Sequence, residues 1–599
     1  MSGMLLNLME IRIGNWVKQR GWRLGPTVGI LLLTTVPAPA MALEIIGNYI
    51  QPGQHFPHSG EVALNPPTTV VGTGNIQDVF AAAAAAWESR FTDPYTVTIN
   101  YGWGHTPASD GVTYASRFDA TTGRVAEAEI RFTNTLNRPG RVWFLDPTPR
   151  QGEEYGPIKS VAADLGGGTL NTGRWAYAIS QPPGFPGTQQ PGGSYSGSDT
   201  SLLDNAVHEI GHALNIYYSR LQSADIGNDG DVDILHGPFA GTQIPYSSAG
   251  GGHPVLPYPQ GAMVMHGYQP SVGMHHGVLS DADVLLAAEV SGFKRVNLDS
   301  VSYTSLADFS DHSILTLNGD ARVAGNVLQL TPDQPGRAGS AFLTVPYHIT
   351  PKTSIETAFS FSTGGVNGNG TKGADGFAFV IQNDPRGQSA LGNSGEGLGF
   401  GLSKTGSNLV PPISHSLAIE FDTHQNAFDG NGNHVAFVAD GDVARHGNLA
   451  SPSFSLNDDV VHYVWIDYDP VSRLWEVFLN ASNTKPSTPL ISDSIDILGL
   501  LGPDAYFGFS AGTGDGFNEH RILQWELVLA SVPEPSTLAL LGLGSTLLAF
   551  RMRRRRLTQQ GWVIGSGLRC GGRRTAWWAH WLRCPANKMG SWERCKATT

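Results

Sequence analysis

Two histidines four residues apart, with a glutamate beside the first, form the most recognisable chemical pattern in this sequence. His208, Glu209 and His212 make an H-E-x-x-H motif. On a helix, residues four apart point the same way, so both imidazoles can reach one zinc ion while Glu209 faces a bound water. Ser201 and Asp204 precede the motif with the spacing of a capping box, which starts that helix. The pattern predicts a zinc site for peptide-bond hydrolysis, although such short patterns also arise on ordinary helices.

A catalytic zinc takes three protein ligands and keeps one position open. In the compact metzincin signature, the third histidine follows six residues after the second, where this chain has Tyr218, and Asn215 replaces the usual glycine. Further on come His253, then Met265, then an L-S-x-x-D segment that starts at Leu279. This order resembles metzincin-like peptidases with an insertion before the third ligand, such as the leishmanolysin-like group.

The resemblance covers roughly residues 44–297. It implies that His253 is the third zinc ligand, that Met265, or less favourably Met263, is the Met-turn residue below the metal, and that Ser280 and Asp283 cap the last helix. The rival third ligands are His236, His266, His275 and His276. Tyr268 is a weaker candidate for holding an oxyanion.

Strands and helices must position this site. The alanine-rich segment 75–91 predicts a helix, and the alternation of residues 95–101 predicts a strand. Strand-like runs also surround residues 128–132 and 175–179. These elements predict an α/β (α+β) domain over residues 43–297. Within it, Asp225, Asp229, Asp231 and Asp233 predict either a calcium loop or a solvated turn.

After Phe293 the sequence changes to short strands separated by Gly, Asn and Asp, which predicts an all-β sandwich. Alternate residues of a strand share a face, so Glu420 and Asp422 converge, while Asn426 and Asp429 follow in a loop and His434 opens the next strand. One imidazole among carboxylates suits a transition metal, and the oxygen donors suit calcium. The alternative is an acidic strand end with a turn.

Segments 373–381, 417–429 and 506–514 resemble the L-type (legume-like) lectins over about residues 303–529. The resemblance implies a jelly-roll sandwich over 298–530. It implies a transition-metal site, with manganese a candidate ion, at Glu420, Asp422, Asp429 and His434. It implies a calcium site at Asp422, the His424 carbonyl, Asn426 and Asp429.

The same resemblance implies a sugar site. Asp375, after a cis peptide from Ala374, and Asn426 would bind sugar hydroxyls, while the segment from Gly395 to Gly397 would lend a backbone N–H. Calcium would hold these groups in position before the sugar binds, which reduces the cost of ordering them. His424 replaces the aromatic residue often found there, and Glu396 replaces a glycine, so aromatic stacking and pocket width stay open.

Length, charge and the terminal segments set the cellular context. A chain of 599 residues is too long for one core, and its net charge of -13 argues against nucleic acid as a partner. Residues 1–42 have the three parts of a signal peptide rather than a spanning helix. Residues 531–556 resemble a PEP-CTERM sorting signal, processed by an exosortase, rather than a lasting membrane anchor. Residues 557–599 hold all three cysteines and lack a regular pattern, so we expect an atypical, disordered tail.

Together these features predict a secreted zinc metalloendopeptidase that a calcium-dependent lectin domain directs to glycans. The expected partners are a protein or peptide substrate, a glycan or exopolysaccharide, signal peptidase and exosortase. The expected location is the bacterial cell surface or extracellular matrix, with transient membrane anchoring. The alternative is a surface lectin or adhesin whose peptidase-like domain is inactive or only binds metal. A glycoside hydrolase is less favoured, because no carboxylate pair stands out beyond the lectin metal site.

Overall fold

The computed structural model describes residues 42–531, except 107–108, 137–141, 153–154, 178–187, 190–194, 197–199, 248–251, 257–262, 266–274, 365–372 and 403–409. Nearly all of the predicted signal peptide and sorting signal, the tail, His266 and Tyr268 therefore lie outside the described residues. Within the described part, no helix is long and apolar enough to cross a membrane.

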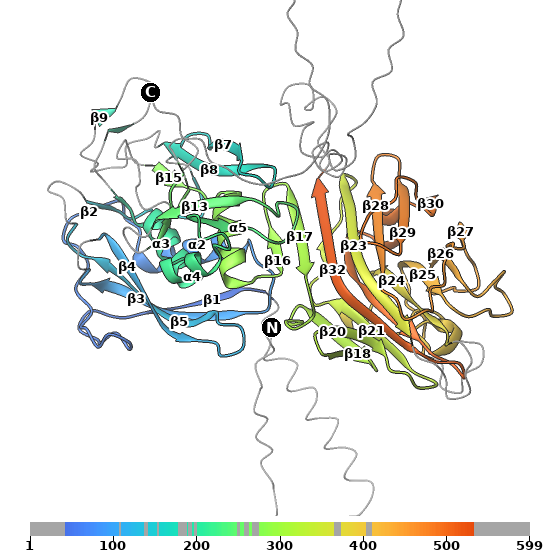
Figure 1. Cartoon of the computed structure of the whole chain (residues 1–599). Helices are drawn as coiled ribbons and strands as arrows, with labels where there is room; N and C mark the ends of the chain where they lie inside the picture. The colour runs from blue at the N-terminus through green and yellow to red at the C-terminus, as the bar shows by residue number, and fades with distance from the viewer. Residues whose placement is uncertain are drawn as a thin grey trace, which may run out of the picture. The chain divides into compact units, whose positions relative to one another are not determined.

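A four-stranded sheet forms the framework of the N-terminal part, in the order β1 (Glu44–Tyr49), β3 (Thr96–Gly104), β5 (Val125–Thr133), β4 (Gly111–Phe118). The first three strands are parallel, and β4 is an antiparallel edge strand. Helices α2 (Ile76–Glu88) and α3 (Leu202–Ala213) lie together beside this sheet (Figure 1). The predicted helix within 75–91 and the predicted strand over 95–101 are thus confirmed.

Local sequence explains where α3 starts and ends. The Ser201 side chain accepts the backbone N–H of Asp204, so the Ser201 half of the predicted capping box is confirmed. Past the other end, Asn215 has a φ of 70°, a left-handed conformation that asparagine tolerates better than most residues. Trp87 of α2 donates its indole N–H to the Val207 carbonyl at 2.8 Å, which fixes α3 against α2.

Shorter elements complete the N-terminal part. The helices are α4 (Tyr218–Ser223) and α5 (Asp281–Ser291), and the small sheets are β2 (Val70–Val71), β6 (Trp143–Phe144) and β11 (Thr200–Ser201); β7 (Lys159–Asp164), β8 (Thr169–Tyr177) and β15 (His275–Gly277); β9 (Thr188–Gln189) and β10 (Tyr195–Ser196); β12 (Asp231–Asp233), β13 (Gln243–Ser247) and β14 (His253–Pro254).

Two large antiparallel sheets make up the C-terminal part. One runs β16 (Arg295–Asn297), β17 (Val301–Leu306), β32 (Glu519–Ser531), β23 (Thr353–Gly364), β28 (His462–Asp469), β29 (Leu474–Asn480), β30 (Ile491–Ser494), with β20 (Val327–Thr331) on β32 and β19 (Arg322–Ala324) on β20. The other runs β18 (Leu315–Gly319), β21 (Ala338–Leu343), β31 (Asp504–Gly512), β24 (Gly376–Gln382), β25 (Ser416–Asp422), β26 (His434–Ala439), β27 (Leu449–Ala450), with β22 (Tyr347–His348) on β31. Short helical turns are η2 (Gly387–Ser389), η3 (Gly395–Gly397) and α6 (Ile497–Leu501).

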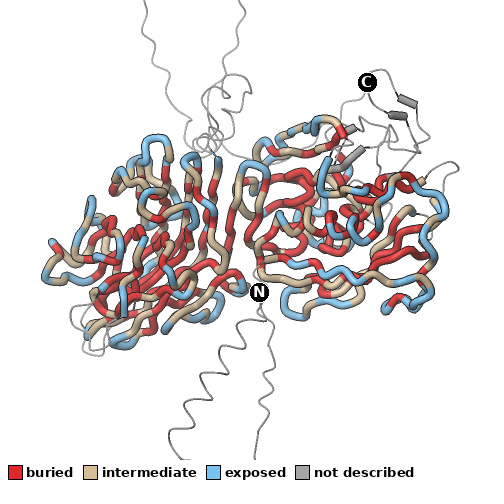
Figure 2. Tube along the Cα trace, turned by 180° about the vertical axis from the view of Figure 1, so that it is seen from behind, coloured by how far each residue is buried: buried red, intermediate tan, exposed pale blue. Residues whose placement is uncertain are grey.

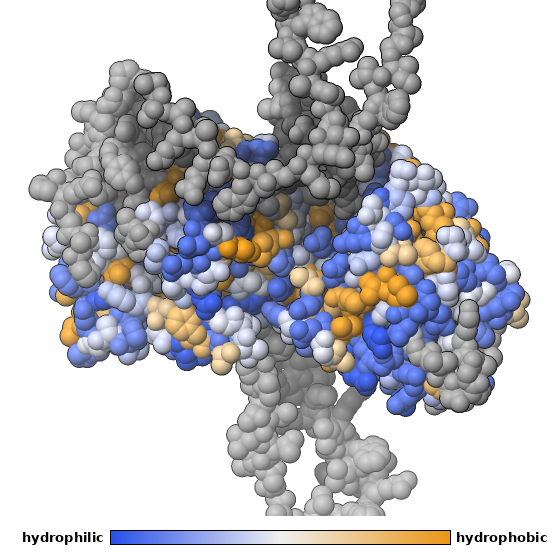
Figure 3. Space-filling view, viewed as in Figure 1, coloured by the Kyte–Doolittle hydropathy of each residue, from blue (hydrophilic) through white to orange (hydrophobic). Residues whose placement is uncertain are grey.

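Side chains from both sheets form one core. Phe359 and Trp525 come from one sheet and Phe379 and Phe509 from the other, and the Phe359 and Phe509 ring centroids are 5.0 Å apart. Figure 2 shows buried residues running along the strands and exposed residues at the turns. The predicted all-β sandwich is therefore confirmed. Hydrophobic and hydrophilic residues are interspersed over the face drawn in Figure 3.

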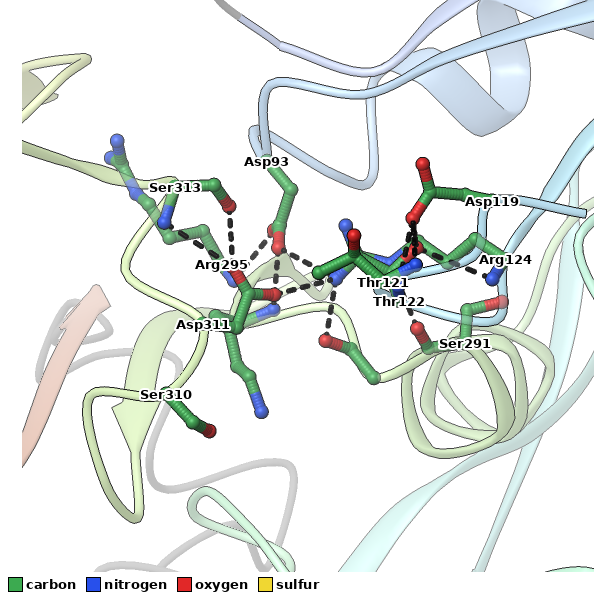
Figure 4. Close-up of polar contacts among 12 residues, drawn as sticks. Asp93, Asp119, Thr121, Thr122, Arg124, Ser291, Arg295, Ser310, Asp311 and Ser313 are labelled. Atoms are coloured by element: carbon green, nitrogen blue, oxygen red, sulfur yellow. Dashed lines mark hydrogen bonds and ion pairs between the residues drawn. The ribbon is translucent and has the colours of Figure 1, made fainter. Parts of the chain in front are cut away.

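The predicted domain boundary between residues 297 and 298 is bridged by hydrogen bonds. The two parts have separate hydrophobic cores, but β16 on one side of the boundary pairs with β17 on the other. Arg124 adds a buried contact, since it pairs with Asp93 at 3.5 Å and with Asp311 at 3.4 Å and donates to the Ser291 carbonyl (Figure 4).

Candidate functional sites

Three imidazoles converge where α3 meets β14. The Nε2 atom of His208 lies 3.1 Å from that of His212 and 3.2 Å from that of His253. The structure thus brings the predicted third ligand to the H-E-x-x-H motif. Of its rivals, His236 is not part of this cluster, and the side chains of His275 and His276 are not among those described.

Backbone carbonyls orient two of these rings. The His208 Nδ1 atom lies 2.8 Å from the Val264 carbonyl, and His212 Nδ1 bonds to the Ile216 carbonyl. A carbonyl only accepts, so the ring proton sits on Nδ1 and the Nε2 lone pair faces the cluster. Burial, then the neighbouring histidines, lower the pKa of His212 well below its usual value. A neutral imidazole is the form that binds a metal, so these residues fit zinc.

The turn that carries Met265 packs beneath α3. A β-carbon added at Gly211 would lie 2.2 Å from Met265 Sδ, so the glycine makes room for the methionine. The buried Asp283 carboxylate accepts the backbone N–H groups of Val264 at 3.2 Å and Met265 at 3.0 Å. It also completes the predicted capping box with Ser280, which is confirmed. Met265 therefore lies directly against the motif helix.

Glu209 is held by the edge strand β4. The Thr113 hydroxyl lies 2.7 Å from Glu209 Oε2 and donates to it. Burial raises the pKa of Glu209 to about 7, and the Thr113 hydrogen bond opposes this rise. Gly111 lets the strand approach, because a β-carbon there would lie 2.7 Å from Glu209 Oε1. The Glu209 carboxylate is thus buried and held by β4.

A second group of metal-compatible side chains lies on β25, β26 and the loop between them. Pairing of β25 with β26 puts Asp422 opposite His434. The ligand atoms of Asp422, Asp429 and His434 lie within 4.8 Å of one another, as do those of Glu420, His434 and His446. The sequence prediction missed His446, whose Nε2 is 2.9 Å from Glu420 Oε1. A lone histidine in a loop carries no spacing signal that would have found it.

Buried oxygens in this second group fit a cation. Asn426 Oδ1 and Asp429 Oδ1 are buried without a hydrogen-bond partner. Burial, followed by repulsion from Glu420, raises the pKa of Asp422 well above its usual value. Acceptors that lack donors are rare in protein interiors, and a bound calcium or transition metal would satisfy them. The His424 imidazole is exposed and outside the cluster, and its backbone N–H donates to Asp422 at 2.7 Å.

The predicted sugar-binding residues lie beside this cluster. The Ala374–Asp375 peptide is cis, as predicted. The Asp375 carbonyl accepts the Thr423 N–H at 2.9 Å, and Asp375 Oδ2 is buried without a partner. Burial raises the pKa of Asp375 to about 7, against the lowering effect of the Gly514 N–H.

Two backbone N–H groups of the predicted sugar-contacting segment have acceptors within the protein. The Gly395 N–H donates to the Thr513 carbonyl at 3.0 Å, and the Gly397 N–H donates to the Ser394 carbonyl at 3.3 Å. A sugar contact by the segment from Gly395 to Gly397 stays a prediction.

The aspartates between residues 225 and 233 form a turn stabilised by its own hydrogen bonds. The Asp225 carboxylate accepts the N–H groups of Asp229 and Gly230, each at 3.1 Å, and the Tyr246 hydroxyl at 3.1 Å. Among the described side chains, the metal-compatible groups do not include these aspartates. Asp231 Oδ1 is buried without a hydrogen-bond partner, and both the calcium loop and the solvated turn stay predictions.

Comparison with known proteins identifies the second region. The Legume lectin domain matches residues 299–539, and the PEP-CTERM protein-sorting motif matches residues 531–556. The L-type lectin-domain containing receptor kinase VIII.1 of Arabidopsis thaliana is 32% identical over 236 residues, which are 37% of this chain and 31% of the kinase. The receptor kinase SIT1 of Oryza sativa subsp. japonica is 32% identical over 243 residues, covering 37% of this chain and 35% of the kinase.

The chain therefore spans about a third of the length of these curated relatives. Among solved structures, basic winged bean lectin with Tn-antigen is 26% identical, with a TM-score of 0.33, and covers 39% of this chain and 100% of the lectin. The lectin from Bauhinia forficata in complex with GalNAc is 22% identical, with a TM-score of 0.33. The match covers 39% of this chain and 100% of the lectin.

The chain thus carries a legume-type lectin domain followed by a PEP-CTERM motif. The motif indicates export and association with the cell surface through a C-terminal segment.

Proposed function

We propose that this chain is a glycan-binding protein of the bacterial surface. The observation that carries the proposal is the set of buried, unpartnered oxygens on Asp375, Asn426 and Asp429 beside the β25–β26 cluster. Calcium, when bound, would be held by Asp422, Asn426 and Asp429 and would fix this loop. The Asp375 carboxylate would then accept hydrogen bonds from sugar hydroxyls, and the Asn426 amide would donate to them. Because the loop is already fixed, binding would not carry a large entropic cost of ordering it.

Glycan binding by the purified chain tests this proposal, with an array of bacterial exopolysaccharides and glycoprotein glycans as the probe. Chelation of calcium should abolish binding, and added calcium should restore it. Asp375→Ala should weaken binding at least about 30-fold, because it removes a buried acceptor of sugar hydroxyls. The control is Asp469→Ala, at the exposed last residue of β28. Binding that survives both chelation and Asp375→Ala would contradict the proposal.

We infer a second activity, zinc-dependent hydrolysis of peptide bonds, from the convergence of His208, His212 and His253 above Met265. Bound zinc would supply the acidification of a water and the polarisation of a scissile carbonyl. Glu209, held by Thr113, is the group that would accept the proton and pass it to the leaving amine. The lectin domain would raise the effective concentration of the peptidase on a glycan-bearing substrate.

Glu209→Gln separates this activity from metal binding. It should lower the rate of cleavage of a mixed peptide library by a factor of about 100 to 10,000, because the base is lost, while the zinc content is retained. Glu127→Gln, on β5, is the matched control, and its rate should equal that of the parent. If the parent holds zinc but cleaves no peptide, while glycan binding is intact, the domain is a metal-binding module and the chain is the adhesin.

A further inference from the structure

His446 reaches the lectin metal cluster from a different segment of the chain than the other donors. It lies in the loop between β26 and β27, and the N–H of the next residue, Gly447, donates to the Phe437 carbonyl of β26 at 2.7 Å. Its Nε2 atom lies 2.9 Å from Glu420 Oε1 and 3.6 Å from Asp429 Oδ1. The ring therefore points at two of the carboxylates assigned to the transition metal.

The surroundings of this ring are those of a ligand rather than of a surface ion pair. The side chain of His446 is 14% exposed, whereas those of Glu420 and Asp429 are 2% and 0% exposed. The other imidazole, His434, is buried and lies with its ring centroid 5.2 Å from that of His446. Asp429 Oδ1 is buried and has no hydrogen-bond partner. Two imidazoles and two carboxylates thus come together at a largely buried position.

We propose that His446 is a fifth protein ligand of the transition-metal site, with Glu420, Asp422, Asp429 and His434. The second imidazole also changes which ion the site prefers. Carboxylate sites suit manganese, whereas imidazole favours cobalt, nickel and zinc, which lie higher in the Irving–Williams order. His446 therefore shifts the preference of the lectin domain from manganese toward these ions. The inference rests on the proposed metal binding of the lectin domain.

Metal titration of the purified chain tests this assignment. Co²⁺ and Mn²⁺ are titrated in separate experiments, each in competition with a chelator. His446→Ala should lower the affinity for Co²⁺ by about 100-fold and that for Mn²⁺ by much less, so the cobalt preference should fall. The visible absorption of the Co²⁺ form should also change, because an imidazole leaves its coordination shell. The parent and the His446→Ala variant share the cluster of His208, His212 and His253, so metal binding there contributes equally to both titrations.

His348→Ala is the matched control, because that imidazole is 68% exposed and lies on the short strand β22. His446→Gln approximately keeps the size of the side chain. Cooperative unfolding of each His446 variant in the absence of metal would show that the variant is folded. If a folded His446→Gln binds Co²⁺ with the parent's affinity and spectrum, His446 forms an ion pair only and the inference is wrong. If the parent binds no metal at these residues and no glycan, the proposed lectin function itself fails.

Discussion

Asp283 supports the histidine cluster without belonging to it. Its carboxylate accepts from the N–H groups of Val264, Met265 and Ser280 and from the Ser280 hydroxyl. The Val264 carbonyl, in turn, accepts from His208 Nδ1. One buried carboxylate therefore holds the turn at Met265 and, through Val264, orients the ring of His208.

Asp283→Asn should weaken zinc binding by about 10- to 100-fold, because the amide NH2 would face backbone donors in place of an accepting oxygen. Chelator competition measures the loss. Asp281→Asn is the control on the same helix, since its carboxylate accepts the Asp299 N–H, at 3.0 Å, away from the Met turn. Equal zinc affinities for the two variants would show that Asp283 does not position the site.

Individual residues were predictable from the sequence where their partners are close along the chain. His208, Glu209 and His212 share one helix, and Ser280 and Asp283 share one capping box, so spacing alone relates them. His446 was missed, because only the pairing of β25 with β26 and of β26 with β27 brings it to Glu420. The sequence also does not reveal that the N–H groups of Gly395 and Gly397 bond to the carbonyls of Thr513 and Ser394.

At the scale of elements, β32 contains a buried histidine that has no role in either site. His520 pairs with Thr331 of β20, with 2.6 Å between Nδ1 and the hydroxyl oxygen. Its Nε2 is buried and lacks a partner. Burial lowers the pKa of His520 to about 3. The folded state therefore keeps this imidazole neutral at pH values where an unfolded chain protonates it.

The β20–β32 pair should accordingly lose stability in acid. Below the unfolded pKa of about 6.5 the unfolded state binds the extra proton, so the free energy of unfolding falls as the pH drops toward 3. Between pH 7 and 4.5 the parent should lose about 2 kcal/mol more than His520→Gln, as measured by denaturant unfolding at both pH values. A parallel pH dependence of parent and variant would refute this role of His520.

Local sequence patterns predicted where helices and strands form better than they predicted which elements pack against one another. Alternation predicted the strand at 95–101, and alanine content predicted α2, because both signals are set by adjacent residues. The antiparallel edge strand β4, which brings Thr113 to Glu209, had no such signal. Its position follows from its antiparallel pairing with the next strand, β5, and from the packing of α3 against it.

At the scale of the whole molecule, Arg124 connects segments far apart in sequence. Its side chain is 4% exposed, pairs with Asp93 and Asp311, and donates to the Gly292 carbonyl at 2.7 Å. The guanidinium also lies 4.7 Å from the Phe293 ring centroid. The change in composition after Phe293 predicted a division into two parts, but it carried no information about this contact between them.

Arg124→Met should lower the free energy of unfolding by about 3 kcal/mol, because it leaves the buried Asp93 carboxylate without its cation. Arg117→Met is the control, since Arg117 is 62% exposed and its pair with Glu127 should contribute less than about 1 kcal/mol. Denaturant unfolding of the two variants measures the difference. Equal losses would show that the Arg124 contacts add no stability.

The last strand of the sandwich also has a mechanical consequence. β32 is hydrogen-bonded to β17 and β20 on one side and to β23 on the other, and the sorting motif starts at residue 531, where the strand ends. A pull applied through that motif enters along the axis of an interior strand. Such a load shears many backbone hydrogen bonds at once instead of opening them one by one. If the chain binds glycans as proposed, tension between the bound glycan and the C-terminal segment would therefore load β32 along its length.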